Sequence, residues 1–170
     1  MIIKYSQVIH SPVVEMKSQT NLGVASDLVI QKSDLTVKAV IIRCGFLKSL
    51  TRVAAASDIV EINSGSVILN DDNSLTTVSE ALRIKEAVQA KMHGVGQYVR
   101  TKSGKTLGRV HDYTIDNATT TIQKLYVKSF FSDRIIPVSA IISFEGQIIT
   151  VKDDFELISN TDPAFNPETA

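Results

Sequence analysis

The first residues with a possible chemical role are Ser103-Gly104-Lys105-Thr106, which resemble the end of a phosphate-binding loop. Such a loop needs another glycine five positions before Gly104, and it leads into a helix whose amino end receives the phosphate. Val99 occupies that earlier position, and the residues after Thr106 have the composition of a strand. The run is therefore interpreted as a turn between two strands.

Two aspartates, Asp112 and Asp116, could be considered as an acid/base pair. Four residues along a strand, at about 3.3 Å each, separate their Cα atoms by roughly 13 Å, whereas carboxylates that flank one bond lie roughly 5 to 9.5 Å apart. Asp27 recurs at the position of Asp112 in an earlier part of the chain. This recurrence favours a structural role, such as accepting backbone hydrogen bonds at a turn.

Metal and thiol chemistry have little support in the sequence. His10, His93 and His111 lack close ligand spacing, although His10 and His93 precede matching strands and would lie near each other if the two halves of the chain pack symmetrically. Cys44 is the only cysteine, and with remote histidines it meets the minimum requirement for a thiol nucleophile. Cys44 is better interpreted as a small, partly buried side chain without a catalytic role. We expect no metal, no cofactor and no enzymatic activity.

Charge is unevenly distributed along a chain whose 18 basic and 18 acidic residues cancel. Residues 87–111 contain five bases and no acid, while residues 153–170 contain five acids and no base. The bases are Lys91, Arg100, Lys102, Lys105 and Arg109. The last four form a candidate interaction surface for an acidic protein, RNA or an anionic membrane. The alternative is a solvated hairpin, partly neutralised by the acidic tail.

The composition predicts a β-rich globular protein. Isoleucine (19), valine (18) and threonine (14) supply 51 of the 170 residues, and these side chains fit a pleated sheet better than a helix. No run of residues is long and apolar enough to span a membrane, and residues 1–10 lack the features of a signal peptide. We therefore expect a cytoplasmic protein with no transmembrane segment.

The two halves of the chain align as an internal repeat. At a shift of 85 residues, the matches are Val14 with Val99, Leu22-Gly23 with Leu107-Gly108, Asp27 with Asp112, and Ile30 with Ile115. The shift falls to 82 and then 81 further on, after a change between two predicted strands, where loops absorb length differences easily. The pattern predicts a duplicated domain, with a separate core in each copy.

Each copy consists of short predicted strands separated by turns. The six strands of the second copy are expected at 97–100, 107–116, 122–127, 134–137, 140–144 and 147–151. So short a sheet is most stable as a small closed or nearly closed barrel, since closure removes unpaired edges. The predicted class is all-β, with two tandem β-barrels joined by a short α-helix.

The boundaries follow from these patterns. Residues 71–91 are rich in helix-forming residues, with a capping box at Thr77 and Glu80. The prediction is a first domain at 1–73, a helical connector at 74–91, a second domain at 92–158 and a flexible tail at 159–170.

The second copy resembles the PRC-barrel domain. The resemblance rests on the ordered runs GKTLGRVHDY (104–113), IQKLYV (122–127), RIIPVSAI (134–141) and QIITVKD (147–153). The first copy matches at 21–27 and 39–42, but it has Val53-Ala54-Ala55-Ala56 where the second has Ile135-Ile136-Pro137-Val138. The arrangement of both copies is similar to that of tandem PRC-barrel proteins of bacteria.

Two functions follow from this resemblance. PRC-barrels act as adaptor domains, which implies a non-catalytic scaffold protein that binds another protein, and a homodimer fits this expectation. The ribosome maturation factor RimM contains the same domain, which implies the alternative of a ribosome-assembly or RNA-processing accessory factor. RNA binding would act through phosphates and weaken steeply as salt rises.

Overall fold

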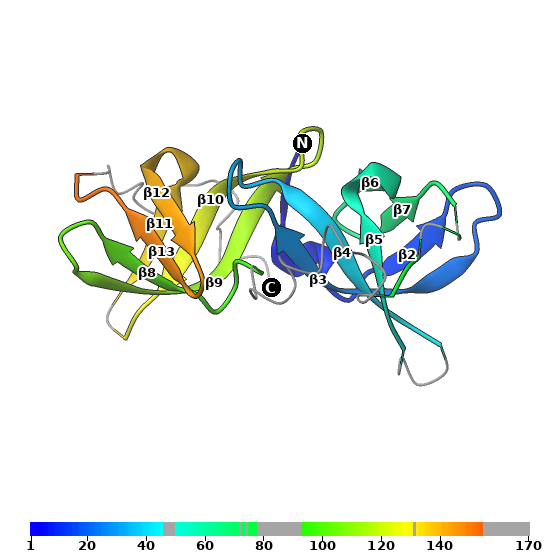
Figure 1. The fold of residues 1–170 in the computed structure, drawn as a ribbon, viewed down its shortest axis with the longest axis horizontal. Helices are drawn as coiled ribbons and strands as arrows, with labels where there is room; N and C mark the ends of the chain where they lie inside the picture. Colours follow the sequence, from blue (N-terminus) through cyan, green and yellow to red (C-terminus); the bar gives the residue numbers. More distant parts are fainter. Residues whose placement is uncertain (46–49, 72, 74, 78–92, 131, 155–170) are drawn as a thin grey trace, which may run out of the picture.

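The chain is built mainly of β-strands arranged in two sheets. A computed structural model describes residues 1–170 except 46–49, 72, 74, 78–92, 131 and 155–170. The two sheets lie side by side along the long axis of the molecule (Figure 1). The β-rich fold that the composition predicts is confirmed.

The first sheet contains six strands in the order β5-β4-β3-β2-β7-β6. Their bounds are β2 Pro12–Glu15, β3 Asn21–Ile30, β4 Val37–Cys44, β5 Leu50–Ala55, β6 Ile59–Ile62 and β7 Val67–Leu69. A short 3₁₀ turn, η2 (Ala56–Asp58), connects β5 to β6.

The second sheet repeats this order as β11-β10-β9-β8-β13-β12. Its strands are β8 Tyr98–Thr101, β9 Thr106–Asp116, β10 Thr121–Lys128, β11 Asp133–Pro137, β12 Ile141–Glu145 and β13 Ile148–Val151, with η4 (Val138–Ala140) between β11 and β12. All six strands predicted for this copy are present. Ser103 and Gly104 lie in the turn between β8 and β9, as predicted.

Identical strand order in the two sheets supports the predicted repeat. One pair in each sheet is parallel, β2 with β7 and β8 with β13, and every other pair on these paths is antiparallel. Strand β5 ends at Ala55 before a 3₁₀ turn, just as β11 ends at Pro137. The missing proline of the first copy therefore does not change where the strand ends.

The repeated glycines are needed for close contact between strands. Gly23 has φ +150° and Gly108 has φ +137°. A Cβ atom would lie 2.4 Å from the carbonyl oxygen of Arg43 at the first position and 2.3 Å from that of Lys128 at the second. Neither the backbone conformation nor the space suits a side chain, which explains the recurrence of glycine.

Two matches in the predicted repeat are wrong by a residue. In the last strand of each copy, Val67 corresponds to Ile149 and not to Ile148, so the shift there is 82 rather than 81.

The other wrong match is in the first strand of each copy. Val13, not Val14, faces Gly23, whereas Val99 faces Gly108. Val13 and Val99 are both fully buried. The segment between the paired positions is one residue longer in the first copy, so the true shift in this strand is 86. Two adjacent valines hid the difference, because either could fill the buried position.

The predicted closed barrels and separate cores are not observed. Among the described residues, no strand pairing joins β5 to β6 or β11 to β12, so each sheet is an open path of pairings. One cluster of buried apolar side chains extends through both sheets, from Leu28 and Val40 to Ile115 and Leu125. The expectation of two independent cores is therefore wrong, because the ends of the two sheets pack against each other.

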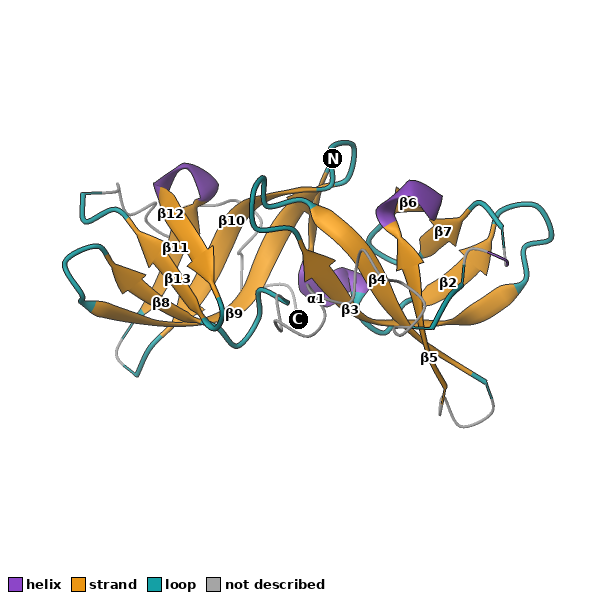
Figure 2. Ribbon diagram, in the orientation of Figure 1, coloured by secondary structure: helices purple, strands orange, loops and turns teal. Residues whose placement is uncertain are grey.

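The N-terminal segment joins the two sheets. Strand β1 (Ile2–Lys4) pairs with the far half of β9, although the sequence placed these residues in the first domain. Helix α1 (Tyr5–Val8) follows and lies between the sheets (Figure 2). A bridge between Thr36 and Thr121 adds a direct backbone link. The two copies are thus connected by strand pairing as well as by chain continuity.

The predicted connector and tail lie largely or wholly outside the residues that the structure describes. The predicted connector helix lies largely at 78–91 and the predicted tail at 159–170, both outside the described residues. Within the described part of the chain, no helix has the length and apolar character needed to cross a bilayer.

Candidate interaction groove on the second sheet

The outer face of the second sheet carries basic and aromatic side chains. Strand β8 alternates exposed and buried residues, so Tyr98 and Arg100 point outward while Val99 is buried in the core. On β9, Arg109 is exposed, whereas Leu107 and Val110 are buried. The period of two therefore places Tyr98 and Arg100 on one face of β8. In β9 a register shift opposite Val99 and Arg100 interrupts the alternation, so Arg109 is exposed although Leu107, two residues earlier, is buried.

Strand register aligns four of these outward residues in one row. Ile148 on β13 pairs with Tyr98 on β8, Tyr98 pairs with Arg109 on β9, and Arg109 pairs with Lys128 on β10. All four are exposed. The row therefore crosses four strands, and residues 50, 11 and 19 positions apart in the chain become neighbours.

Tyr98 and Arg109 form the best-defined contact of the row. The guanidinium carbon of Arg109 lies 4.0 Å from the centre of the Tyr98 ring, within the range of a cation–π contact. The same guanidinium also donates a hydrogen bond to the Tyr98 hydroxyl. Arg109 is thereby held against the sheet surface.

A surface groove of about 680 Å³ begins at this contact. Its lining consists of Tyr98, Thr106, Gly108, Arg109, Lys128, Ser129 and Phe130. Phe130 is the second residue after β10 and its side chain is fully exposed. The volume is within the range of sites that hold a small molecule or a few side chains.

Only one of the four predicted surface residues lines the groove. Arg109 lines the groove, and Arg100 is exposed on β8 but does not line it. Lys102 and Lys105 are exposed in the turn between β8 and β9. The sequence analysis did not predict Tyr98, Lys128 and Phe130 as part of this surface. Lys128 is on β10 and Phe130 is in the loop after it, so both are far in the chain from the basic stretch. Alternation in β8 was the only signal that could have placed Tyr98 beside Arg109.

The acidic end of the described chain contacts the basic hairpin. The Asp153 carboxylate accepts hydrogen bonds from the Ser103 hydroxyl at 2.6 Å and from its backbone N–H at 3.0 Å. These bonds, the hydroxyl bond foremost, lower the pKa of Asp153 below its ordinary value. Part of the acidic stretch thus has a structural role at this turn.

The repeated aspartates lie at the junction of the two sheets and have structural partners. Asp27 accepts hydrogen bonds from the Tyr5 hydroxyl and the Leu28 backbone N–H. Asp112 accepts bonds from the backbone N–H and hydroxyl of Ser6 and from the backbone N–H that follows it. The predicted role in accepting backbone hydrogen bonds is confirmed, at β-bulges rather than at a turn.

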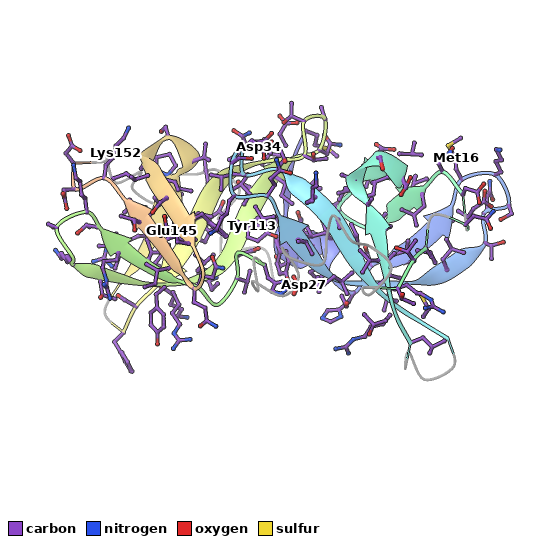
Figure 3. The ribbon with its side chains drawn as sticks, viewed as in Figure 1. Met16, Asp27, Asp34, Tyr113, Glu145 and Lys152 are labelled. Atoms are coloured by element: carbon purple, nitrogen blue, oxygen red, sulfur yellow. The ribbon has the colours of Figure 1, made fainter. Side chains whose placement is uncertain are left out.

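Tyr113 is the largest fully buried side chain at this junction (Figure 3). Its ring contacts Tyr5, with the ring centres 4.8 Å apart, and its hydroxyl has no hydrogen-bond partner in the described structure. Burial, reinforced by nearby Tyr5 and the aspartates, raises the pKa of Tyr113 well above its ordinary value. The hydroxyl is therefore neutral and unsuited to act as a base.

The remaining candidates do not assemble into a site. Nδ1 of His93 lies 3.0 Å from a carboxylate oxygen of Asp27 but lacks the geometry of a hydrogen bond. Burial raises the pKa of the Cys44 thiol, which disfavours the thiolate form. Within the described ranges, no three histidine, cysteine, aspartate or glutamate side chains gather in a way that could hold a metal ion.

Comparison with known proteins adds no assignment: no protein-family model matches the chain, and no curated protein is similar enough to match.

Proposed function

We propose that this chain is a non-catalytic adaptor, built from two PRC-type β-barrel domains, that binds another protein through the outer face of its second sheet. The observation that carries the proposal is the groove beside the Tyr98–Arg109 contact. Exposed aromatic and arginine side chains are enriched where proteins bind one another. The groove combines both on one face of the sheet.

The PRC-type barrel in this proposal is supported by strand connectivity and by the sequence resemblance. In each copy a three-residue 3₁₀ turn is all that separates the two strands at opposite ends of the sheet, β5 from β6 and β11 from β12. Such a short connection brings the two ends of the sheet close together, which requires a strongly curved sheet. This curvature and the repeated strand order are what a pair of small barrels needs.

Divergence between the copies supports a binding role for the second one. At the positions that correspond to Tyr98, Arg109 and Lys128, the first sheet has Pro12, Val24 and Arg43, which pair in the same register. The first copy folds with these residues, so neither the aromatic ring nor Arg109 is required by the strand order. Their presence in the second copy is better explained by a contact with a partner.

Co-purification from the native organism tests this function. The tagged wild-type protein is compared with Arg109→Glu, and Arg43→Glu in the first sheet serves as the matched control. The proposal expects a specific protein that is retained by wild type and by the Arg43 variant but lost from the Arg109 variant. Absence of any specific protein partner would overturn it. Ribosomal particles that dissociate steeply with salt would favour the RNA-related alternative instead.

A further inference from the structure

We infer that the groove binds an acidic peptide segment with an aromatic or large aliphatic anchor, supplied by the partner protein. This inference rests on the proposed adaptor function and names the chemistry of its partner. It is carried by charge complementarity at Arg109 and Lys128 and by the aromatic side chains beside them.

The two cations of the groove are available to a ligand. Arg109 and Lys128 are directly opposite each other on β9 and β10, where like charges oppose strand pairing. Both side chains are exposed, and neither forms an ion pair with an acidic residue in the described parts of the chain. A carboxylate between them would be attracted by both positive charges and accept a charge-assisted hydrogen bond from Arg109.

The apolar part of the groove suits a single anchor side chain. Phe130 is fully exposed and Tyr98 is 41% exposed. A phenylalanine or leucine of a partner that packed against Phe130 and against the part of Tyr98 that Arg109 leaves open would remove apolar surface of both rings from water. The volume of about 680 Å³ accommodates such a side chain with its neighbours in the peptide.

A peptide fits this face better than RNA does. The basic part of the row is narrow, since Asp133 stands opposite Lys128 on β11 and Glu145 stands opposite Ile148 on β12. A bound RNA strand would need a longer positive track for its phosphates. The guanidinium of Arg109 also covers one face of the Tyr98 ring, and that face is therefore closed to a stacked base.

Fluorescence anisotropy with defined probes tests the inference on the full chain. The main probe is a short labelled peptide in which phenylalanine is flanked by glutamates. One control peptide replaces the glutamates with lysines, another replaces the phenylalanine with alanine, and an oligouridylate represents RNA. The variants are Arg109→Gln, Lys128→Gln and Phe130→Ser, with Arg100→Gln as the matched control on the same face but outside the groove.

The inference expects saturable binding of the glutamate–phenylalanine peptide only. Each of the three groove variants should weaken it by about tenfold or more, while Arg100→Gln stays within about twofold of wild type. Circular dichroism of each variant checks that the sheets are retained, and Lys128→Gln provides the charge test if Arg109→Gln disturbs the fold.

Four results would overturn the inference: equal binding of the lysine peptide, equal binding of the alanine peptide, preference for the oligouridylate, or no binding of any probe. None of them would by itself refute the adaptor function, which depends on the co-purified partner. A partner that is captured through another surface would refute the groove assignment and leave the adaptor function intact.

Discussion

Gly108→Ala is the substitution whose effect can be worked out most fully from the structure. Gly108 has φ +137°, and an added Cβ would lie 2.3 Å from the backbone carbonyl oxygen of Lys128. A backbone conformation that other residues rarely adopt costs of order 1–3 kcal/mol. The clash adds about 1–3 kcal/mol, because the obstacle is backbone on a paired strand and cannot rotate away.

The expected loss of unfolding free energy is therefore about 2–6 kcal/mol, a large share of the roughly 5–15 kcal/mol that stabilises a typical protein. In a chain of this length, each kcal/mol lowers the melting temperature by about 2–4 °C. We expect Tm to fall by at least roughly 4 °C, as measured by differential scanning calorimetry. Urea unfolding followed by circular dichroism gives the free energy independently.

Two control variants separate backbone strain from steric contact. Gly104 also has a positive φ, of +94°, but a Cβ there would have no atom within 4 Å, so Gly104→Ala should cost about 1 kcal/mol. Gly65 has neither a positive φ nor a close neighbour, and Gly65→Ala should be close to neutral. If Gly108→Ala were no more destabilising than Gly104→Ala, the close approach of β9 and β10 would be refuted.

The corresponding substitution in the first sheet tests the repeat and the shared core. Gly23→Ala introduces the same contact with a backbone carbonyl, at 2.4 Å, and should cost a similar amount. Since one apolar cluster extends through both sheets, either variant should shift a single calorimetric transition. Two separate transitions, one of them unchanged, would show that the copies unfold independently.

The other predictions concern the junction and the hairpin. Ile3→Ala should cost about 2–5 kcal/mol in urea unfolding, because it leaves a cavity under β1, and a loss below about 1 kcal/mol would contradict the burial of this strand. Tyr113→Phe removes a buried hydroxyl that has no partner, so stability should be unchanged or slightly higher, whereas a clear loss would reveal a hidden hydrogen bond. The folded-state pKa of Asp153 is depressed by Ser103, so this carboxylate stabilises the fold above its unfolded pKa and loses the effect as pH falls through the folded pKa. Asp153→Asn should therefore destabilise at neutral pH and converge with wild type in acid, and identical curves at all pH values would refute this.

The sequence by itself determined the local structure and the repeat. Alternating β-branched residues predicted the strands, because side chains on opposite faces of a strand meet different environments. Gly23 and Gly108 indicated equivalent positions, since a close approach of two backbones excludes every larger residue. The role of Asp27 and Asp112 followed from their recurrence, although their partners did not.

Only the tertiary structure decided how the copies meet and where the groove lies. Pairing of β1 with β9 depends on which strand edge the folded second copy leaves open, and the three residues of β1 carry no signal for that choice. The groove unites Tyr98, Arg109 and Lys128 through the register of three strands. Register is set by hydrogen bonding and packing across the sheet, so residues that are distant in the chain become a surface only after folding.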